Sequence, residues 1–368
     1  MDYARYYLGT LFMIAGIAGF ALGGPWVWLG AATFPAAVLL DLLTGRPDPT
    51  PRAIRHPRLA EIPLYLHALL MPALVITAAR CLRPGSMITP TLLGGIWATL
   101  AWLGVMPNVP VAHELIHRRG RAPRVLGFLL AVMIGDPLRR LAHLRGHHVK
   151  LGLPDDSDTA RRGESIYAFM FRASIGGTRE AFLSEKSRMA RHGRSVWSLR
   201  SDVVHSIVAT AGVLLAIGLL AGPLAALVIG GSFLLSRLLL EAFNYLQHYG
   251  IVRAPGTRYD RRHTWSHLTP VVRAAGLEIT NHAHHHMNPD VPFHALIPDP
   301  TAPQMPSALL CFMAALVPPV WERWIAMPRL KDWDMRHASP AEKALAREAN
   351  AAAGWPEWVA EEQGAAAP

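Results

Sequence analysis

Four imidazole side chains fall within five consecutive positions, 282 to 286, of this 368-residue chain. His282, His285 and His286 lie at i, i+3 and i+4, a spacing that places all three on one face of a helix. Neutral imidazole is the commonest metal ligand in proteins, so this face predicts one side of a metal site. We expect His284 to point away from it. A solvent-exposed histidine tract is the alternative interpretation.

Three other stretches add histidines at related spacings. His113 and His117 lie four residues apart, as do His143 and His147, and a further histidine follows directly at position 148. A single histidine, His248, stands at the end of a long apolar run. Residues four apart share a helix face, so each pair has the spacing of two ligands of a metal site.

Together these stretches contain nine candidate ligands, which is too many for one metal. A structural zinc site takes four protein ligands and a catalytic one takes three, whereas nine imidazoles suit two metals of four or five ligands each. Imidazole binds zinc, copper, iron and nickel, so the ligand type alone leaves the metal open. We predict a dinuclear centre held by His113, His117, His143, His147, His148, His248, His282, His285 and His286.

The composition indicates that a membrane protein positions these histidines. Hydrophobic residues make up 51% of the chain, charged residues make up 17%, and the mean hydropathy is +0.22. The net charge of +10 suits an anionic partner, which could be nucleic acid or a membrane surface. The long apolar runs favour the membrane surface. The two cysteines, Cys81 and Cys311, allow neither a disulfide framework nor a cysteine-based metal site.

Six apolar segments, arranged as three hairpins, are long enough to cross a membrane. Arginines cluster between the hairpins, within residues 45–61 and 112–201, and the positive-inside rule assigns such segments to the cytoplasm. The predicted fold is therefore all-α, a six-helix transmembrane bundle whose cytoplasmic helical cap holds the metals. The spans are approximately residues 6–23, 26–43, 63–79, 88–111, 203–220 and 224–245.

The remaining apolar stretches are too short to span or are interrupted. Residues 125–134 predict a buried or interfacial helix, as do residues 307–321, which contain two adjacent prolines. The alanine-rich tail predicts a surface helix or disorder. The predicted segments are 1–111, with four spans and the loop 45–61; 112–202, with the first two histidine clusters; 203–247, with two spans; 248–337, with His248 and the last cluster; and the tail 338–368.

Two other functions fit parts of the histidine pattern. His113, Glu114 and His117 form the HExxH signature of zinc proteases, in which the glutamate is the general base, but six clustered histidines are then unexplained. A metal transporter would place histidines within its spans, whereas these clusters lie at span ends. His263 and His267 are also four residues apart, but they flank a loop-like stretch, and we predict that they are not ligands.

Several motifs resemble those of one enzyme family. HxxxH, HxxxHH and HxxHH are the three histidine boxes of integral-membrane desaturases and hydroxylases. Residues 35–300 resemble bacterial alkane 1-monooxygenases and their xylene monooxygenase relatives, and the motifs GESIY and NYxxHYG separate this group from fatty acyl desaturases. The matching motifs are His113-Glu-Leu-Ile-His117, Arg145-Gly-His-His148, Gly163-Glu-Ser-Ile-Tyr167, Asn244-Tyr-Leu-Gln-His-Tyr-Gly250, His282-Ala-His-His-His286 and Leu39-Leu-Asp-Leu-Leu43.

The resemblance implies a dioxygen-dependent monooxygenase with two non-haem irons in a bacterial inner membrane, reduced by rubredoxin and its reductase. Terminal hydroxylation of an n-alkane is the expected reaction. Hydroxylation of an alkyl-aromatic, terpene or fatty acyl substrate and a desaturase-type oxidation are the alternatives. The diiron centre is itself the catalytic group, and we assign no separate acid or base. Ala142, Asn281 and Asn288 depart from the family's usual residues, but none replaces an expected ligand.

Carboxylates near the histidine boxes are candidates to accept hydrogen bonds from metal-bound imidazoles and so to fix their tautomers. The candidates are Glu114, Asp136, Glu241, Glu278 and Asp290. We expect an apolar substrate pocket among the spans, lined by residues such as Trp28, Phe34 and Trp102.

The chain contains no cysteine cluster for an iron–sulfur centre and no GxGxxG motif for a flavin or nicotinamide cofactor. Electrons must therefore come from another protein. We expect it to dock on the arginines beside the first two histidine boxes, since rubredoxins are generally acidic. These arginines are Arg118, Arg119, Arg121, Arg124, Arg139 and Arg140.

Overall fold

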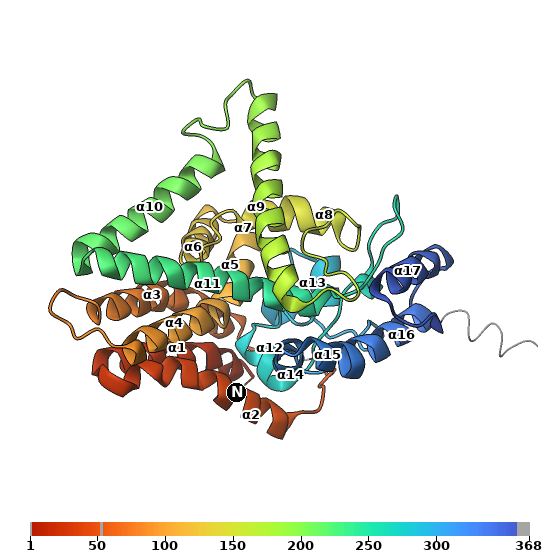
Figure 1. Cartoon of the computed structure of the whole chain (residues 1–368), viewed down its shortest axis with the longest axis horizontal. Coiled ribbons are helices and arrows are strands. Elements are labelled where there is room, and N and C mark those ends of the chain that lie inside the picture. Colours follow the sequence, from red (N-terminus) through yellow and green to blue (C-terminus); the bar gives the residue numbers. More distant parts are fainter. Residues whose placement is uncertain (1, 52–53, 359–368) are drawn as a thin grey trace, which may run out of the picture.

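The computed structural model describes residues 2–51 and 54–358; for His148 it describes the backbone but not the side chain. Within these ranges the chain forms helices joined by turns and loops, and no β-strand (Figure 1). The all-α prediction is therefore confirmed. Long apolar runs account for this result, because a helix pairs every backbone polar group inside its own segment and so suits a membrane.

In the described part of the chain, six helical segments are long and apolar enough to cross a membrane, and each overlaps a predicted span. Figure 1 shows α1, α3, α4 and α11 running side by side, whereas α10 diverges from α11 beyond their shared turn. The segments contain α1 (Leu8–Leu22), α2 (Leu29–Thr44), α3 (Pro57–Arg80), α4 (Pro90–Val105), α5 (Asn108–His117), α10 (Asp202–Ala221) and α11 (Pro223–His248).

The fourth span differs from its prediction, because it is divided into two helices. The sequence predicts an uninterrupted helix to about Val111, but α4 ends at Val105 and α5 begins at Asn108. Pro107 stands at the break, where it has no N–H to donate to the preceding turn. Apolar content does not reveal such a break. As a result α5 is a separate helix, and it carries the first two histidines.

Among the helices beyond the spans, α6 packs against α5 and α14 against α11, while α16 and α17 extend to the right in Figure 1. The two stretches predicted to be interfacial or buried form α6 and the pair α14–α15, and Trp321 at the end of α15 is fully buried. These helices are α6 (Arg121–Val132), α7 (Arg139–Leu141), α8 (His148–Lys150), α12 (Pro270–Ala275), α13 (His282–Met287), α14 (Ala308–Ala315), α15 (Pro318–Trp321), α16 (Met327–Arg336) and α17 (Pro340–Ala353).

A long helix, α9 (Ile166–Arg191), runs across the direction of α11 rather than along it (Figure 1). Ser165 caps its first turn by accepting the N–H of Ala168. The loop before α9 contacts the end of α11 in three places. Tyr249 accepts the N–H of Gly163, Tyr245 donates to the carbonyl of Glu164, and the N–H of Gly250 donates to Ala160. The GESIY and NYxxHYG motifs therefore support each other at the end of the sixth span.

The tail is more firmly attached than the prediction of a surface helix or disorder implies. Helix α17 begins with a capping box in which Ser339 and Glu342 each accept the other's backbone N–H. Glu342 is buried and also accepts hydrogen bonds from His263 at 2.8 Å and from Arg262 at 3.1 Å. The first part of the tail is therefore docked on the cap, while residues 359–368 lie outside the described part of the chain.

Candidate metal centre

Helix α5 presents the first two histidines to the interior of the protein. His113 and His117 lie one turn apart, and their ring centroids are 4.6 Å apart. The remainder of this helix is anchored by buried apolar side chains such as Leu115 and Ile116. Burial of the apolar side fixes the rotation of the helix about its axis and therefore the direction of its histidine face.

The second histidine box does not lie on an ordinary α-helix. Residues 142–147 form a π-helical turn, a feature that is frequent at functional sites. Its two histidines, His143 and His147, are both buried. The extra backbone in such a turn changes the direction of successive side chains, and these two histidines approach different partners.

The other histidines come from two helix ends. His248 is the last residue of α11, and His282 is the first residue of α13. Their Nε2 atoms lie 2.9 Å apart, and Nε2 of His286, one turn later on α13, lies 3.0 Å from that of His282. His285 is also buried, but its ring lies toward α5, 4.6 Å from the ring of His113.

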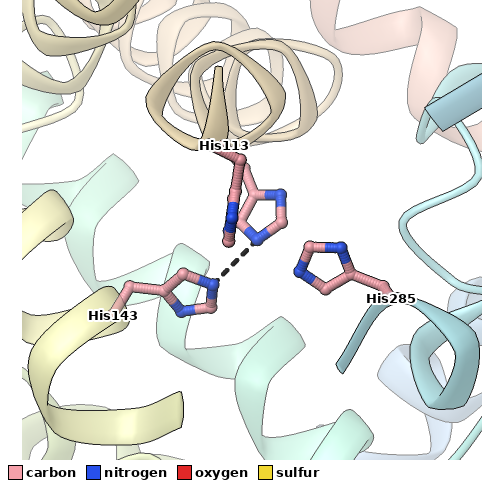
Figure 2. Close-up of side chains that lie close together, drawn as sticks. His113, His143 and His285 are labelled. Carbon is pink, nitrogen blue, oxygen red and sulfur yellow. Dashed lines mark hydrogen bonds between the residues drawn. The ribbon is translucent and has the colours of Figure 1, made fainter. Parts of the chain in front are cut away.

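Two groups of imidazole nitrogens result from this arrangement. In the first group, one nitrogen from each of four side chains lies within 4.8 Å of the others, and Figure 2 shows three of these rings converging from α5, the π-helical turn and α13. Nε2 of His113 and Nε2 of His143 are 2.8 Å apart. The first group consists of His113, His117, His143 and His285.

The second group lies beside the first and is fully buried. Its three side chains are His147, His248 and His286, and His282 contacts two of them as described above. The rings of His147 and His248 have centroids 4.5 Å apart. The side chain of His148, the ninth predicted ligand, lies outside the described part of the structure.

The histidines predicted not to be ligands lie elsewhere. Nδ1 of His284 accepts the N–H of Ile297 at 3.5 Å, on the other side of α13. His263 contacts the tail through Glu342, and His267 donates from Nδ1 to the carbonyl of Pro306 at 2.6 Å. None of these three side chains belongs to either nitrogen group among the described residues.

The nitrogen positions fit metal ions. An imidazole nitrogen binds a metal at about 2.0–2.1 Å, so two ligands at right angles have nitrogens about 3 Å apart. The separations of 2.9 and 3.0 Å around His282 match that arrangement. Burial lowers the pKa of His282 to about 3, so the imidazole is in the neutral form that binds metals.

The carboxylate of Asp156 contacts a histidine of the second group, and Asp156 is not among the predicted candidates. Asp156 accepts a hydrogen bond from Nδ1 of His147 at 3.1 Å, which leaves Nε2 facing the second group. The hydroxyl of Thr159 and the N–H of Asp158 also donate hydrogen bonds to the carboxylate of Asp156. Burial opposes ionisation of Asp156, but His147 and these donors outweigh it and lower the pKa. The sequence signal was the acidic cluster 155–158, a short distance after the second box.

The five carboxylates chosen from the sequence each form an ion pair with an arginine. Glu278 is the most informative of them, because it supports the third box indirectly. It accepts hydrogen bonds from Arg273 at 2.6 Å and from the amide of Asn281 at 2.7 Å, and Asn281 is the residue directly before α13. The pairs are Glu114 with Arg118, Asp136 with Arg139, Glu241 with Arg139, Glu278 with Arg273, and Asp290 with Arg119.

A buried charge network joins the segments on either side of the second histidine box to α11. Arg139 contacts Asp136, Asp158 and Glu241, and it is only 7% exposed. Burial and the nearby Glu241 raise the pKa of Asp158 to about 7. The prediction that Arg139 forms part of a docking surface is therefore wrong, because this side chain neutralises interior carboxylates. Arg121 and Arg124 are exposed, as the prediction requires.

An apolar cavity of about 60 Å³ adjoins both histidine groups. Of the three predicted pocket residues, none lines this cavity. Trp28 is 41% exposed and donates to the carbonyl of Thr91 near the start of α4. Trp102 lines a separate small cavity, and Phe34 packs against it with ring centroids 4.9 Å apart. The walls nearest the histidines include Val105, Met106, Val109, Ile134, Leu240, Phe243 and Asn244.

Comparison with known proteins agrees with this arrangement. The model of the fatty acid desaturase family matches residues 88–298. The xylene/toluene monooxygenase hydroxylase component XylM of Pseudomonas putida is 40% identical over 99% of both chains. Alkane 1-monooxygenase 1 of Pseudomonas aeruginosa is 28% identical, over 82% of this chain and 81% of its own.

The histidine boxes lie within the matched region, and the similarity to the xylene enzyme covers nearly the whole chain. These findings favour the resemblance over a zinc protease or a metal transporter. The histidine clusters and the family together indicate a metal site in a membrane protein. The chain therefore belongs to the fatty acid desaturase family, within its group of alkane and xylene monooxygenases, and is a dioxygen-dependent membrane hydroxylase of apolar substrates.

Proposed function

We propose that this protein binds two irons, one at each histidine group, and hydroxylates the methyl group of a small alkyl-aromatic substrate. The observation that carries the proposal is that two groups of buried imidazole nitrogens adjoin one apolar cavity. The first iron is held by His113, His117, His143 and His285, and the second by His147, His248, His282 and His286, with His148 as a further candidate ligand.

The substrate class rests on relative similarity. The xylene/toluene enzyme is 40% identical to this chain, whereas the alkane 1-monooxygenases are 25–28% identical. The alkyl-aromatic alternative is therefore favoured over the n-alkane first expected. An n-alkane is the second candidate, because a cavity with walls such as Leu240 and Phe243 accepts any apolar molecule of suitable size.

When bound, the irons supply the activation of dioxygen and the oxidation of the C–H bond. The residues of the chain provide the setting. The eight described histidines of the two groups hold the metals, and Asp156 keeps the proton of His147 on Nδ1. Val105, Ile134 and Phe243 exclude water and position the substrate. The overall reaction consumes the substrate, dioxygen, two electrons and two protons, and it gives an alcohol and water.

The two electrons come from a separate protein. Rubredoxin is the donor that the sequence resemblance implied, and the proposal keeps it as the first donor to test. The exposed residues Arg121 and Arg124 suit an acidic partner. We place the histidine-bearing end and both termini in the cytoplasm and the protein in the inner membrane, because the arginine-rich segments lie at that end.

The proposal is tested with purified protein in lipid, supplied with rubredoxin and its reductase, dioxygen labelled with ¹⁸O, and a mixture of toluene, xylenes and n-alkanes. We expect about two irons per chain and a benzylic alcohol carrying one labelled oxygen. If labelled alkanols are the only products, the proposed alkyl-aromatic substrate is wrong and an n-alkane is the substrate. Turnover with an iron–sulfur reductase but not with rubredoxin would overturn the donor assignment, and fusions reporting the side of each terminus test the orientation.

A further inference from the structure

A second apolar cavity lies directly behind the one that adjoins the histidines. It measures about 10 Å³, which is close to the minimum that holds a single water molecule. It is formed where α1, α2, α4, α12 and α14 meet, and every residue that lines it is apolar. Those residues are Phe12, Ala37, Trp102, Met106, Val271, Val272, Ala275 and Leu309.

Two side chains line both cavities. Met106 and Val272 contribute to the walls of the cavity at the histidines and also to the walls of the second cavity. They are 6% and 2% exposed, so both are enclosed by protein. These two residues therefore form the partition between the two spaces.

The position of Met106 follows from the break in the fourth span. Met106 is the residue after α4, its backbone is extended, and its N–H donates to the carbonyl of Trp102 at 2.7 Å. It thus stands between the two helices rather than on the outer face of either. Val109 and His113 follow on α5 and line the cavity at the histidines.

Beyond the partition, the far wall is rigid. The indole of Trp102 donates to the hydroxyl of Thr33 at 2.8 Å, and Phe34 packs edge-on against its ring. A side chain fixed by both a hydrogen bond and an aromatic contact does not move readily. By contrast, the side chain of Met106 is flexible and unbranched. The partition is the adjustable wall, and Trp102 is the fixed one.

We infer that Met106 and Val272 set the upper length limit of the substrate, because they separate the cavity at the histidines from the second cavity. The inference rests on the proposed function, because it specifies the substrate of the same site. A substrate with its reacting methyl group at the histidines directs its far end at this partition. Short alkyl-aromatic molecules fit in front of it, and longer homologues require the space behind it.

The test measures kcat/KM for toluene, 4-ethyltoluene, 4-propyltoluene and 4-butyltoluene with the wild-type holoenzyme and the Met106→Ala enzyme. Each methylene that gains an apolar environment is worth roughly tenfold or more in specificity. We expect Met106→Ala to raise the ratio of kcat/KM for 4-butyltoluene to that for toluene by at least about tenfold. Val272→Ala should change the ratio in the same direction, which provides an independent variant if one protein folds poorly.

A second-site change distinguishes the partition from general loosening of the pocket. Ala37 lines only the second cavity, so Ala37→Leu in the Met106→Ala enzyme fills the space that the first change opened. The gain for long substrates should then be lost while metal content is kept. Met13→Ala is the matched control, because Met13 is fully buried in α1 but lines neither cavity. It should leave the ratio between homologues unchanged.

An unchanged ratio in both Met106→Ala and Val272→Ala would overturn the inference, as would a gain that survives Ala37→Leu. Failure of the proposed substrate gives a different result. If the wild type oxidises no alkylbenzene but does oxidise n-alkanes, the same variants are compared on a series of n-alkanes. A shift toward longer alkanes would then support the partition and reject the aromatic substrate.

Discussion

His143 and His147 have nearly parallel rings, with 22° between their planes and 5.6 Å between their centroids, yet they belong to different histidine groups. The same division occurs on α13, where His285 belongs to the first group and its neighbour His286 to the second. The second and third boxes therefore both bridge the two groups. Through this sharing, a few short segments supply two adjacent groups of candidate metal ligands.

We expect single histidine substitutions to remove metals selectively. His143→Ala and His285→Ala should each weaken the first site, and His147→Ala the second, because each deletes one nitrogen of a group. Each variant should insert in the membrane, retain about one iron per chain and lose hydroxylation. Iron analysis and product assays measure both effects. His284→Ala is the control, since this ring lies outside both groups, and loss of iron in that variant would contradict the assigned helix face.

Asp156→Asn should weaken the second site although the residue is no ligand. The amide cannot hold the proton of His147 in the same way, and loss of such a partner typically reduces metal affinity or activity about 10–100-fold. Titration with a chelator and turnover assays measure the change. Asp155→Asn is the matched control, because the carboxylate of Asp155 is next to Asp156 in the sequence but is exposed and pairs with Lys150. Equal loss in both variants would exclude a specific role for Asp156.

Reversal of Arg121 and Arg124 to glutamate should raise the apparent KM for an acidic electron donor without changing iron content. Complementary surface charge accelerates encounter, and salt screens charges beyond about 8 Å at physiological ionic strength. Turnover of the wild type at limiting donor should therefore fall as salt is added. Arg83→Glu, at an exposed turn on the opposite end of the spans, is the control. A donor KM insensitive to salt and to the reversals would place the docking surface elsewhere.

Trp28→Ala should leave the preference among substrates of different size unchanged, although the sequence suggested this residue as part of the pocket. Trp28 is partly exposed near the start of α4 and does not line the cavity at the histidines. Val105→Ala, by contrast, enlarges that cavity and should favour bulkier substrates by about tenfold. Competition assays with toluene and larger alkylbenzenes compare the two. A shift with Trp28→Ala alone would move the pocket toward α2.

The attachment of the tail should depend on pH through Glu342. Burial opposes ionisation of this carboxyl, but the hydrogen bonds from His263, Ser339 and Arg262 outweigh it and hold the pKa below its ordinary value of 4.5. A lowered carboxyl pKa gives stability that is present above about pH 4.5 and is lost as the pH falls toward the folded-state pKa. Pepsin cleavage of the tail should therefore accelerate over that interval. Glu342→Gln should loosen the tail at pH 7 and flatten the pH dependence.

The sequence alone was sufficient for the approximate positions of the spans and for the family, and it proposed the candidate ligands. Membrane spans follow from apolar length, because the bilayer requires each segment to satisfy its own backbone hydrogen bonds. The nine histidines were identified from spacing and residue type, and eight of their side chains are seen to converge. These features are local, so a linear pattern contains them.

Only the tertiary structure decided how those histidines divide and what supports them. Adjacent residues such as His285 and His286 separate because of side-chain direction around a helix, and the π-helical turn separates His143 from His147. Asp156 reaches His147 because the chain folds back after the second box. The cavity depends on where five or more elements meet, so bulky aromatic residues in the spans did not locate it. Such contacts join segments distant in the sequence, and no spacing rule encodes them.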